Sequence, residues 1–93
     1  MRFLIADDHE LVRRGMRSIV ESRGNVDVSE AQNGIEAVER TKREKFDLVI
    51  LDVSMPGRSG LDVLRDLKVL RPKLPILVLS MHHASPQETP HRR

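Results

Sequence analysis

The sequence predicts an α/β fold in which a parallel β-sheet carries helices on both faces. Short, uninterrupted apolar runs recur along the chain, and such runs are typical of strands that are buried on both sides. They alternate with longer segments in which apolar residues recur at helical spacing. Strands and helices that alternate through short connections form right-handed crossovers, which build a parallel sheet. The 93 residues suffice for one small domain.

The first half of the chain begins with a strand predicted at Phe3–Ala6. The segment His9–Ser22 follows, with apolar residues on one helical face and arginines, Arg13 among them, on the other. This pattern predicts an amphipathic helix, and Gly24 is well placed to end it. A second strand is predicted from Val26 to about Ala31.

The second helix is predicted to begin after a turn at Asn33 and Gly34. Its first turn contains Ile35, Ala37 and Val38, but the remainder, through Glu44, is almost wholly polar. We therefore expect this helix to be the least firmly packed of the three.

The central strand is predicted at Leu48–Leu51 and ends on Asp52. Residues 54–58 have the composition of a turn. Ser59, with Asp62 three residues later, forms a capping-box pattern that predicts the start of the third helix. Four leucines are expected to form the buried stripe of that helix: Leu61, Leu64, Leu67 and Leu70.

The last predicted strand comes after Pro72 and Pro75, which end the third helix. It covers Ile76–Leu79 and ends on Ser80. Residues 82–93 have no apolar periodicity and contain two prolines, so we expect a disordered polar tail there. The histidines in that tail are expected to be solvated rather than to bind a metal.

The composition excludes several classes of protein. Cysteine is missing, which excludes disulfide frameworks, thiolate nucleophiles and cysteine zinc sites and is compatible with a reducing cytoplasm. Asp7 and Asp8 interrupt the first apolar run too early for a signal peptide, and no run reaches membrane-spanning length. The net charge is +2, but basic and acidic residues are interspersed, without the aromatic-interleaved stripe of a nucleic-acid platform. We therefore expect a cytoplasmic protein without membrane contact.

Carboxylates follow two of the predicted strands. Asp7 and Asp8 come directly after the first strand, and Asp52 ends the third. If these strands are parallel neighbours, the three like charges converge at one edge and repel unless a cation joins them. Oxygen ligands without cysteine favour Mg²⁺, which is typically held by one or two carboxylates together with phosphate oxygens. Alternatively, the aspartate pair caps the following helix, and both roles are compatible because one aspartate can cap while the other binds.

These residues resemble a known family. The acidic pair, the central strand ending on an aspartate, the Met-Pro-Gly loop and the hydroxyl at the end of the fourth strand occur in the order found in receiver domains of bacterial two-component response regulators. The residues that carry this resemblance are Asp7, Asp8, Asp52, Met55, Pro56, Gly60 and Ser80. The resemblance covers about residues 1–82 and is strongest to the NarL/FixJ-like branch of transcription regulators. It implies a flavodoxin-like, CheY-like receiver fold of about four strands and three helices, and the family is itself a standard example of the rule that ligands bind where the strand order reverses.

The resemblance also implies roles for individual residues. Asp52 would accept a phosphoryl group from the phosphohistidine of a sensor histidine kinase. Mg²⁺ would be bound directly by Asp8, Asp52 and the backbone carbonyl of Ser54, and through water by Asp7. Ser80 would be the switch hydroxyl that hydrogen-bonds the phosphoryl oxygens, although a serine at a strand end also satisfies backbone groups. Such a module is a phosphoacceptor rather than an enzyme, and it reaches DNA only through a separate output domain.

The sequence departs from the family after the fourth predicted strand. Family members continue through a helix, a fifth strand ending in lysine and a last helix, whereas here every lysine precedes Ser80. We therefore expect residues 1–81 to form a truncated receiver domain and residues 82–93 to form the tail. We also expect the fourth strand to be an exposed apolar edge that promotes self-association.

Two other functions remain open at this stage. The first is an inert receiver fragment that self-associates or titrates partners without accepting phosphate. The second is a Mg²⁺-dependent phosphohydrolase with Asp52 as nucleophile, which ranks lower because Val53 and Ser54 place no acid or base next to it.

Overall fold

The computed structural model describes residues 1–54 and 59–79. The described chain alternates strands and helices, as the sequence predicted, with four strands and three helices. Their bounds are β1 Arg2–Ala6, α1 Glu10–Glu21, β2 Asp27–Ala31, α2 Gly34–Arg43, β3 Leu48–Asp52, α3 Gly60–Leu70 and β4 Ile76–Leu79. No helix of the described part is long and apolar enough to cross a membrane. The predicted tail at residues 82–93 lies outside the described residues.

The four strands form one parallel sheet in the order β2-β1-β3-β4. Strand β1 lies inside the sheet because the chain first crosses through α1 to place β2 on one side of it. It then crosses through α2 to place β3 on the other side. The register sets Ala6 opposite Leu51, so the carboxyl ends of β1 and β3 are level with each other. This reversal of strand order is the point at which open α/β sheets bind ligands.

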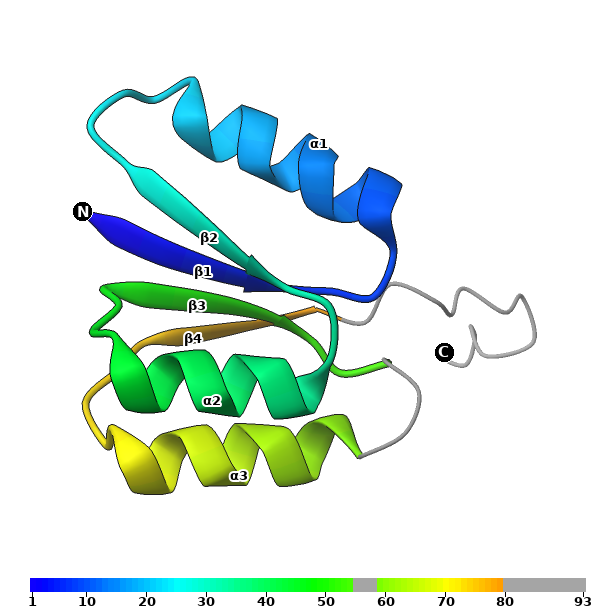
Figure 1. The fold of residues 1–93 in the computed structure, drawn as a ribbon, viewed down its shortest axis with the longest axis vertical. Coiled ribbons are helices and arrows are strands. Elements are labelled where there is room, and N and C mark those ends of the chain that lie inside the picture. The colour runs from blue at the N-terminus through cyan, green and yellow to red at the C-terminus, as the bar shows by residue number, and fades with distance from the viewer. Residues whose placement is uncertain (55–58, 80–93) are drawn as a thin grey trace, which may run out of the picture.

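The helices divide unequally between the two faces of the sheet. Figure 1 shows α1 on one face and α2 and α3 side by side on the other. Alternate residues of the central strands serve each face, so that Leu4 and Val49 point into the larger core under α2 and α3, while Ile5 and Ile50 face α1. The core under α1 is completed by partly buried side chains such as Met16.

The expectation that the second helix is the least firmly packed is wrong. Helix α2 buries Gly34, Ala37 and Thr41 and lies against both the sheet and α3, whereas Arg13 is the buried residue of α1. The polar end of α2 remains attached because Arg71, which follows α3, donates to the Thr41 carbonyl oxygen, while the Thr41 hydroxyl is satisfied within α2 by the Ala37 carbonyl oxygen. Helix α1, in contrast, has no helix beside it within the described ranges.

The predicted leucine stripe of α3 is also partly wrong. The buried residues of this helix are Gly60, Val63 and Leu67, and the side chain of Leu61 is 63% exposed. A repeat of three residues drifts by about 60° per step around a helix of 3.6 residues per turn, so four such leucines cannot share one face. The predicted helix start is confirmed, because Ser59 is the N-cap and its hydroxyl accepts from the Leu61 amide at 3.2 Å.

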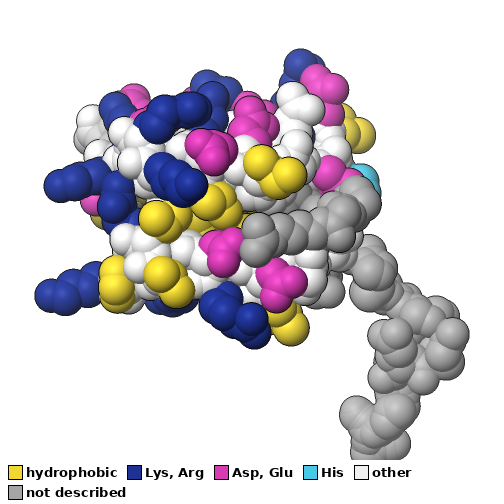
Figure 2. Space-filling model, turned by 60° about the horizontal axis from the view of Figure 1, so that its bottom comes forward, with side chains coloured by type: hydrophobic (Ala, Val, Ile, Leu, Met, Phe, Trp, Pro, Cys, Tyr) yellow, Lys and Arg dark blue, Asp and Glu magenta, His cyan; other side chains and the backbone are white. Residues whose placement is uncertain are grey.

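An amphipathic groove lies between α2 and α3 on the outer side of the molecule. Figure 2 shows hydrophobic side chains gathered among charged ones on this face. The groove has a volume of about 360 Å³. Its lining consists of Ile35, Val38, Glu39, Lys42, Asp66, Val69 and Leu70. Both helices therefore leave apolar side chains, among them Ile35 and Val69, outside the core.

Gly60 sets how closely α3 approaches the strand that carries Asp52. A Cβ atom at this position would overlap the Cα atom and the carbonyl oxygen of Val53, which are backbone atoms that cannot rotate away. We expect Gly60→Ala to lower the free energy of unfolding by about 1–3 kcal/mol, the usual cost of overpacking. Urea denaturation followed by circular dichroism measures this change.

Gly15 provides the matched control, because it lies in the middle of α1 with nothing near the place of a new Cβ atom. We expect Gly15→Ala to raise the free energy of unfolding by about 0.5–1 kcal/mol, since alanine loses less conformational entropy in a helix. Equal effects of the two substitutions would contradict the close approach of α3 to Val53.

Candidate functional site

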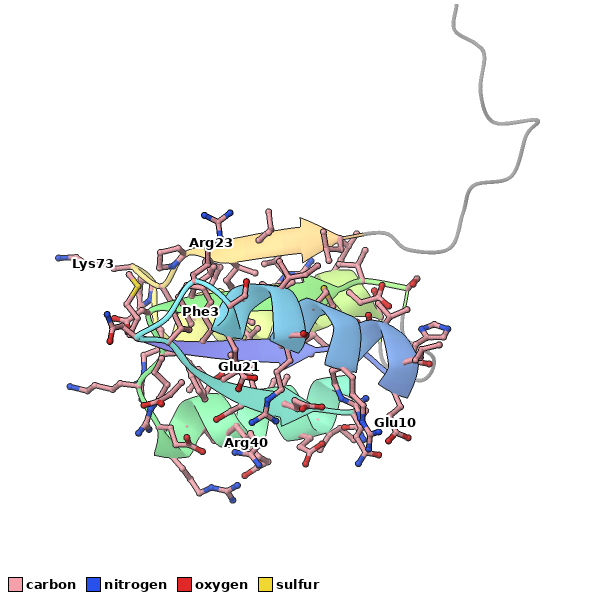
Figure 3. The ribbon with its side chains drawn as sticks, turned by 90° about the horizontal axis from the view of Figure 1, so that it is seen from above. Phe3, Glu10, Glu21, Arg23, Arg40 and Lys73 are labelled. Carbon is pink, nitrogen blue, oxygen red and sulfur yellow. The ribbon has the colours of Figure 1, made fainter. Side chains whose placement is uncertain are left out.

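The candidate site lies at the carboxyl ends of β1 and β3, where acidic side chains from the two strands meet. Asp7 directly follows β1, and Asp52 is the last residue of β3. Because β1 and β3 are parallel neighbours, the two residues come side by side. Both are fully buried. Figure 3 shows the same end of the molecule from the α1 face, where Glu10, the first residue of α1, lies next to this edge of the sheet.

Four side chains converge there. One oxygen each of Asp7, Asp8 and Asp52 and one ring nitrogen of His9 all lie within 4.8 Å of one another. The structure thus brings together the three carboxylates that the sequence placed at one sheet edge. Their functional roles remain predictions.

The two carboxylate oxygens of Asp52 have different surroundings. Oδ1 accepts hydrogen bonds from the Ser54 amide at 2.8 Å and from the Ser54 hydroxyl at 2.6 Å. Oδ2 is buried and has no hydrogen-bond partner among the described residues. Ser54 therefore fixes the orientation of the carboxylate while leaving one oxygen available.

The acidic pair after β1 is arranged differently from a simple cap. The N-cap of α1 is His9, and its side chain makes no capping hydrogen bond. Asp7 accepts instead from the His9 amide, through Oδ1 at 2.8 Å. Asp7 Oδ2 and Asp8 Oδ1 are buried without a hydrogen-bond partner among the described residues. Asp7 thus organises the start of the helix with one oxygen and keeps the other free.

His9 belongs to the cluster, and the sequence analysis did not include it. Its Nδ1 lies 3.1 Å from Asp7 Oδ1 and 3.1 Å from Asp8 Oδ1, although the contact to Asp8 lacks the alignment of a hydrogen bond. The hydrogen bond to Asp7, aided by the charge of Asp8, raises the pKa of the imidazole above its ordinary value. Its position directly after two aspartates was the available signal, because that position allows its ring to turn back onto them.

These surroundings fit a hard divalent cation. A buried carboxylate oxygen without a partner is costly, and three carboxylates at this separation repel one another. Mg²⁺ would satisfy the free oxygens of Asp7 and Asp8 and offset the negative charge of all three carboxylates, and it prefers oxygen ligands of this kind. Asp7, Asp8 and Asp52 are therefore the residues that could hold the ion.

Arg13 is the second feature that sequence reasoning missed. It was assigned to the solvated face of the first helix, but it is only 7% exposed. One guanidinium nitrogen donates to the Asp7 carbonyl oxygen at 2.7 Å, and Nε donates to Glu30 Oε1 at 2.6 Å. Arg17 donates to the other oxygen of Glu30 at 2.6 Å. The hydrogen bonds from Arg17 and then from Arg13 lower the pKa of the Glu30 carboxyl group.

Two predicted features of the site lie outside the described residues. Ser80, the predicted switch hydroxyl, and residues 55–58 of the predicted loop are not among the described residues. Ser54 is described and bonds to Asp52, while metal binding by its carbonyl group stays a prediction.

Comparison with known proteins gives the family of the chain. The response regulator receiver domain family matches residues 3–90. The response regulator UvrY of Escherichia coli K12 is 39% identical over 84 residues, which cover 89% of this chain and 38% of UvrY. The chain therefore spans well under half the length of this curated relative.

Two solved structures show the same fold. The response regulator protein TrrA of Thermotoga maritima, in complex with Mg²⁺ and BeF, is 30% identical with a TM-score of 0.82 over 95% of this chain and 76% of that one. A chain from the complex of the histidine kinase ThkA with TrrA is 32% identical with a TM-score of 0.80, over 90% of this chain and 73% of that one. The parallel sheet with helices on both faces is therefore confirmed as a CheY-like receiver fold. The family match, the sequence identities and the shared fold together establish that this chain belongs to the response regulator receiver domain family.

Proposed function

We propose that Asp52 accepts a phosphoryl group from the phosphohistidine of a sensor histidine kinase, with Mg²⁺ bound beside it. The observation that carries this proposal is Asp52 Oδ2, which is buried at the end of β3 beside two other carboxylates and has no hydrogen-bond partner in the described part of the chain. The receiver family is a family of signalling domains of two-component systems, which supports a phosphoacceptor rather than an enzyme in the ordinary sense. The histidine kinase bound to TrrA supports the choice of phosphodonor.

The chain's own residues would position the reaction. Ser54 holds Asp52 Oδ1, so Oδ2 is the oxygen that attacks phosphorus. The new O–P bond forms while the N–P bond of the phosphohistidine breaks, and the electron pair of that bond returns to the imidazole nitrogen of the kinase. The product is an acyl phosphate on Asp52. Because a carboxylate is a modest nucleophile, positioning of the attacking oxygen is the main contribution of the protein.

Mg²⁺, when bound, would neutralise the charge on the transferring phosphoryl oxygens. In this proposal Asp8, Asp52 and the Ser54 carbonyl oxygen are direct ligands, and Asp7 acts through a coordinated water. TrrA was solved with Mg²⁺ and BeF, which supports the choice of ion. Ser80 is the proposed switch hydroxyl, on the basis of the family resemblance.

The wider role follows the relatives and is proposed on the same footing. UvrY is a response regulator, and the nitrate/nitrite response regulator protein NarP of Escherichia coli K12 is another relative, 39% identical over 83 residues. We propose that this receiver belongs to the transcription-regulating branch and reaches DNA only through an output domain. We also propose a cytoplasmic location, which a chain that needs no disulfide permits.

Acetyl phosphate tests Asp52 as the acceptor. Incubation of the wild type with acetyl phosphate and Mg²⁺ is expected to add one phosphoryl mass, because a small phosphodonor needs only a positioned carboxylate and a cation. Intact-mass spectrometry measures the gain. Asp52→Asn is expected to show none, since an amide oxygen does not form the acyl phosphate.

Asp27→Asn is the matched control, because Asp27 is an exposed aspartate at the start of β2, at the opposite end of the sheet. This variant is expected to be phosphorylated like the wild type. A folded wild type that gains no mass would favour the inert-fragment alternative, and a gain that persists in Asp52→Asn would remove Asp52 from the proposal.

Thermal unfolding with and without Mg²⁺ tests the metal site. We expect Mg²⁺ to raise the stability of the wild type, by about 2.7 kcal/mol at a concentration one hundred times its Kd. Asp52→Asn is expected to be more stable than the wild type without Mg²⁺, by about 1–3 kcal/mol, because one of three crowded charges is removed. It should gain much less from the ion. Asp27→Asn should keep the full response, and an equal response in all three proteins would argue against the site.

We also propose that the 93-residue chain self-associates through β4. This strand lies at an edge of the described sheet, and its side chains Leu77 and Val78 are 51% and 41% exposed. An exposed apolar edge favours pairing with another strand, and a symmetric dimer would pair two copies of β4 in antiparallel fashion.

Sedimentation velocity over a range of concentrations tests this association. Leu77→Lys is expected to weaken it, because a charged edge residue opposes pairing. Val69→Lys, on the exposed side of α3, should leave it unchanged. A compact monomer at high concentration in the wild type would end the proposal.

A further inference from the structure

We propose that Arg13 is a positioning residue for the metal site, because it fixes the peptide unit that joins the two aspartates after β1. The inference rests on the proposed function, since it assigns a role in holding the ion. Arg13 touches neither the ion nor the phosphoryl group in this proposal. It acts through the backbone of Asp7.

The burial of Arg13 is the first step of the argument. A buried guanidinium group is costly unless its charge is compensated and its N–H groups are hydrogen-bonded. Arg13 is 7% exposed, and its two recorded partners are Glu30 on β2 and the carbonyl oxygen of Asp7. The carboxylate of Glu30 compensates the charge, which leaves the bond to Asp7 as the contact with a direct consequence for the site.

The Asp7 backbone is held on both sides. Its amide donates to the carbonyl oxygen of Ala31 at 3.1 Å, and its carbonyl oxygen accepts from Arg13 at 2.7 Å. Ala31 and Glu30 are neighbours on β2, so both contacts connect Asp7 to the same strand. The amide group and the carbonyl group of Asp7 are therefore both held by contacts that lead to β2, one directly and one through Arg13.

The carbonyl group of Asp7 belongs to the planar peptide unit that leads into Asp8. This peptide unit joins the Cα atoms of Asp7 and Asp8, so fixing its plane restricts where the two carboxylate groups lie relative to Asp52. Both Asp7 Oδ2 and Asp8 Oδ1 are among the buried oxygens without a partner within the described ranges. Residues that orient metal ligands through hydrogen bonds commonly affect metal affinity about 10- to 100-fold.

Arg17 supplies an internal comparison. It donates to Glu30 at 2.6 Å, as Arg13 does, and also to Glu21 at 3.0 Å. Within the described part of the chain Arg17 makes no hydrogen bond to Asp7, and its side chain is 42% exposed. Loss of either arginine therefore removes one ion pair with Glu30, but only loss of Arg13 releases the Asp7 carbonyl.

The charge of Arg13 and its positioning role predict opposite changes in the affinity for Mg²⁺, so the sign of the change distinguishes them. Removing a positive charge near three carboxylates strengthens the binding of a cation by Coulomb attraction alone. A substitution that weakens the binding of Mg²⁺ must therefore act through the positions of the ligands. Loss of Arg17 should show the electrostatic effect by itself.

The experiment measures the Kd of Mg²⁺ for the 93-residue protein by isothermal titration calorimetry, at constant ionic strength. Arg13→Gln is expected to raise the Kd about 10-fold. Arg17→Gln is expected to leave the Kd unchanged or lower. Arg13→Lys keeps the charge but lacks the planar fork that serves Glu30 and Asp7 together, so its Kd should lie between those of the wild type and Arg13→Gln.

A second readout reports on positioning without activity. Backbone amide resonances of Asp7 and Asp8, followed by NMR without Mg²⁺, should shift in Arg13→Gln and not in Arg17→Gln. If Arg13→Gln does not fold by circular dichroism, Arg13→Lys decides the question by the same two measurements.

Two results would overturn the inference. The first is an unchanged or lower Kd in a folded Arg13 variant, and the second is equal weakening by loss of Arg13 and of Arg17, which would assign both arginines a structural role only. A wild type that binds no Mg²⁺ would instead refute the proposed metal site itself, and it would be recognised before any variant is measured.

Discussion

The pairing of β1 with β3 is the interaction on which the site depends. It brings together two strand ends that are 45 positions apart in the chain, Asp7 and Asp52, and holds them level in the sheet. The residues that follow β1 cannot avoid meeting the end of β3, since parallel neighbours end at the same edge. The cost is a concentration of like charge in a buried place, which a cation bound there would offset.

The two faces of the sheet are held in different ways. The face under α2 and α3 has a continuous apolar core, to which Leu4, Val49 and Leu67 contribute. The face under α1 has a smaller core, and a polar network from Arg13 and Arg17 to Glu30 joins the helix to β2. This network depends on ionised Glu30, whose pKa is lowered by the two arginines, so its stabilising effect is present above the ordinary pKa of the carboxyl group and is lost as the pH falls through the lowered value. The helix that follows the acidic pair is thus fastened by hydrogen bonds with defined directions.

The corrections for Arg13 and for α2 share one cause, because each prediction considered a helix in isolation. The leucine stripe of α3 fails already on helix geometry, since a repeat of three residues does not stay on one face. In the fold, Gly60 and Val63 face the core because α3 must approach Val53 closely, and Leu61 is turned outward. Arg13 is buried because a carboxylate on the neighbouring strand and a backbone carbonyl lie within its reach. The weakness expected for α2 is offset in the same way, since α3 lies alongside it.

The amino-acid sequence alone determined the order and type of the elements and the parallel sheet, because these follow from local periodicity and from alternating strands and helices. It placed Asp7, Asp8 and Asp52 at one edge only on the condition that the first and third strands are neighbours. That adjacency is a contact between distant parts of the chain, and the tertiary structure supplied it. Only the tertiary structure decided that one Asp52 oxygen has no partner among the described residues, that His9 turns back onto the aspartates and that Arg13 holds the Asp7 carbonyl. Each of these depends on the direction of a side chain and on what lies opposite it, and neither is encoded in the spacing of residues along the chain.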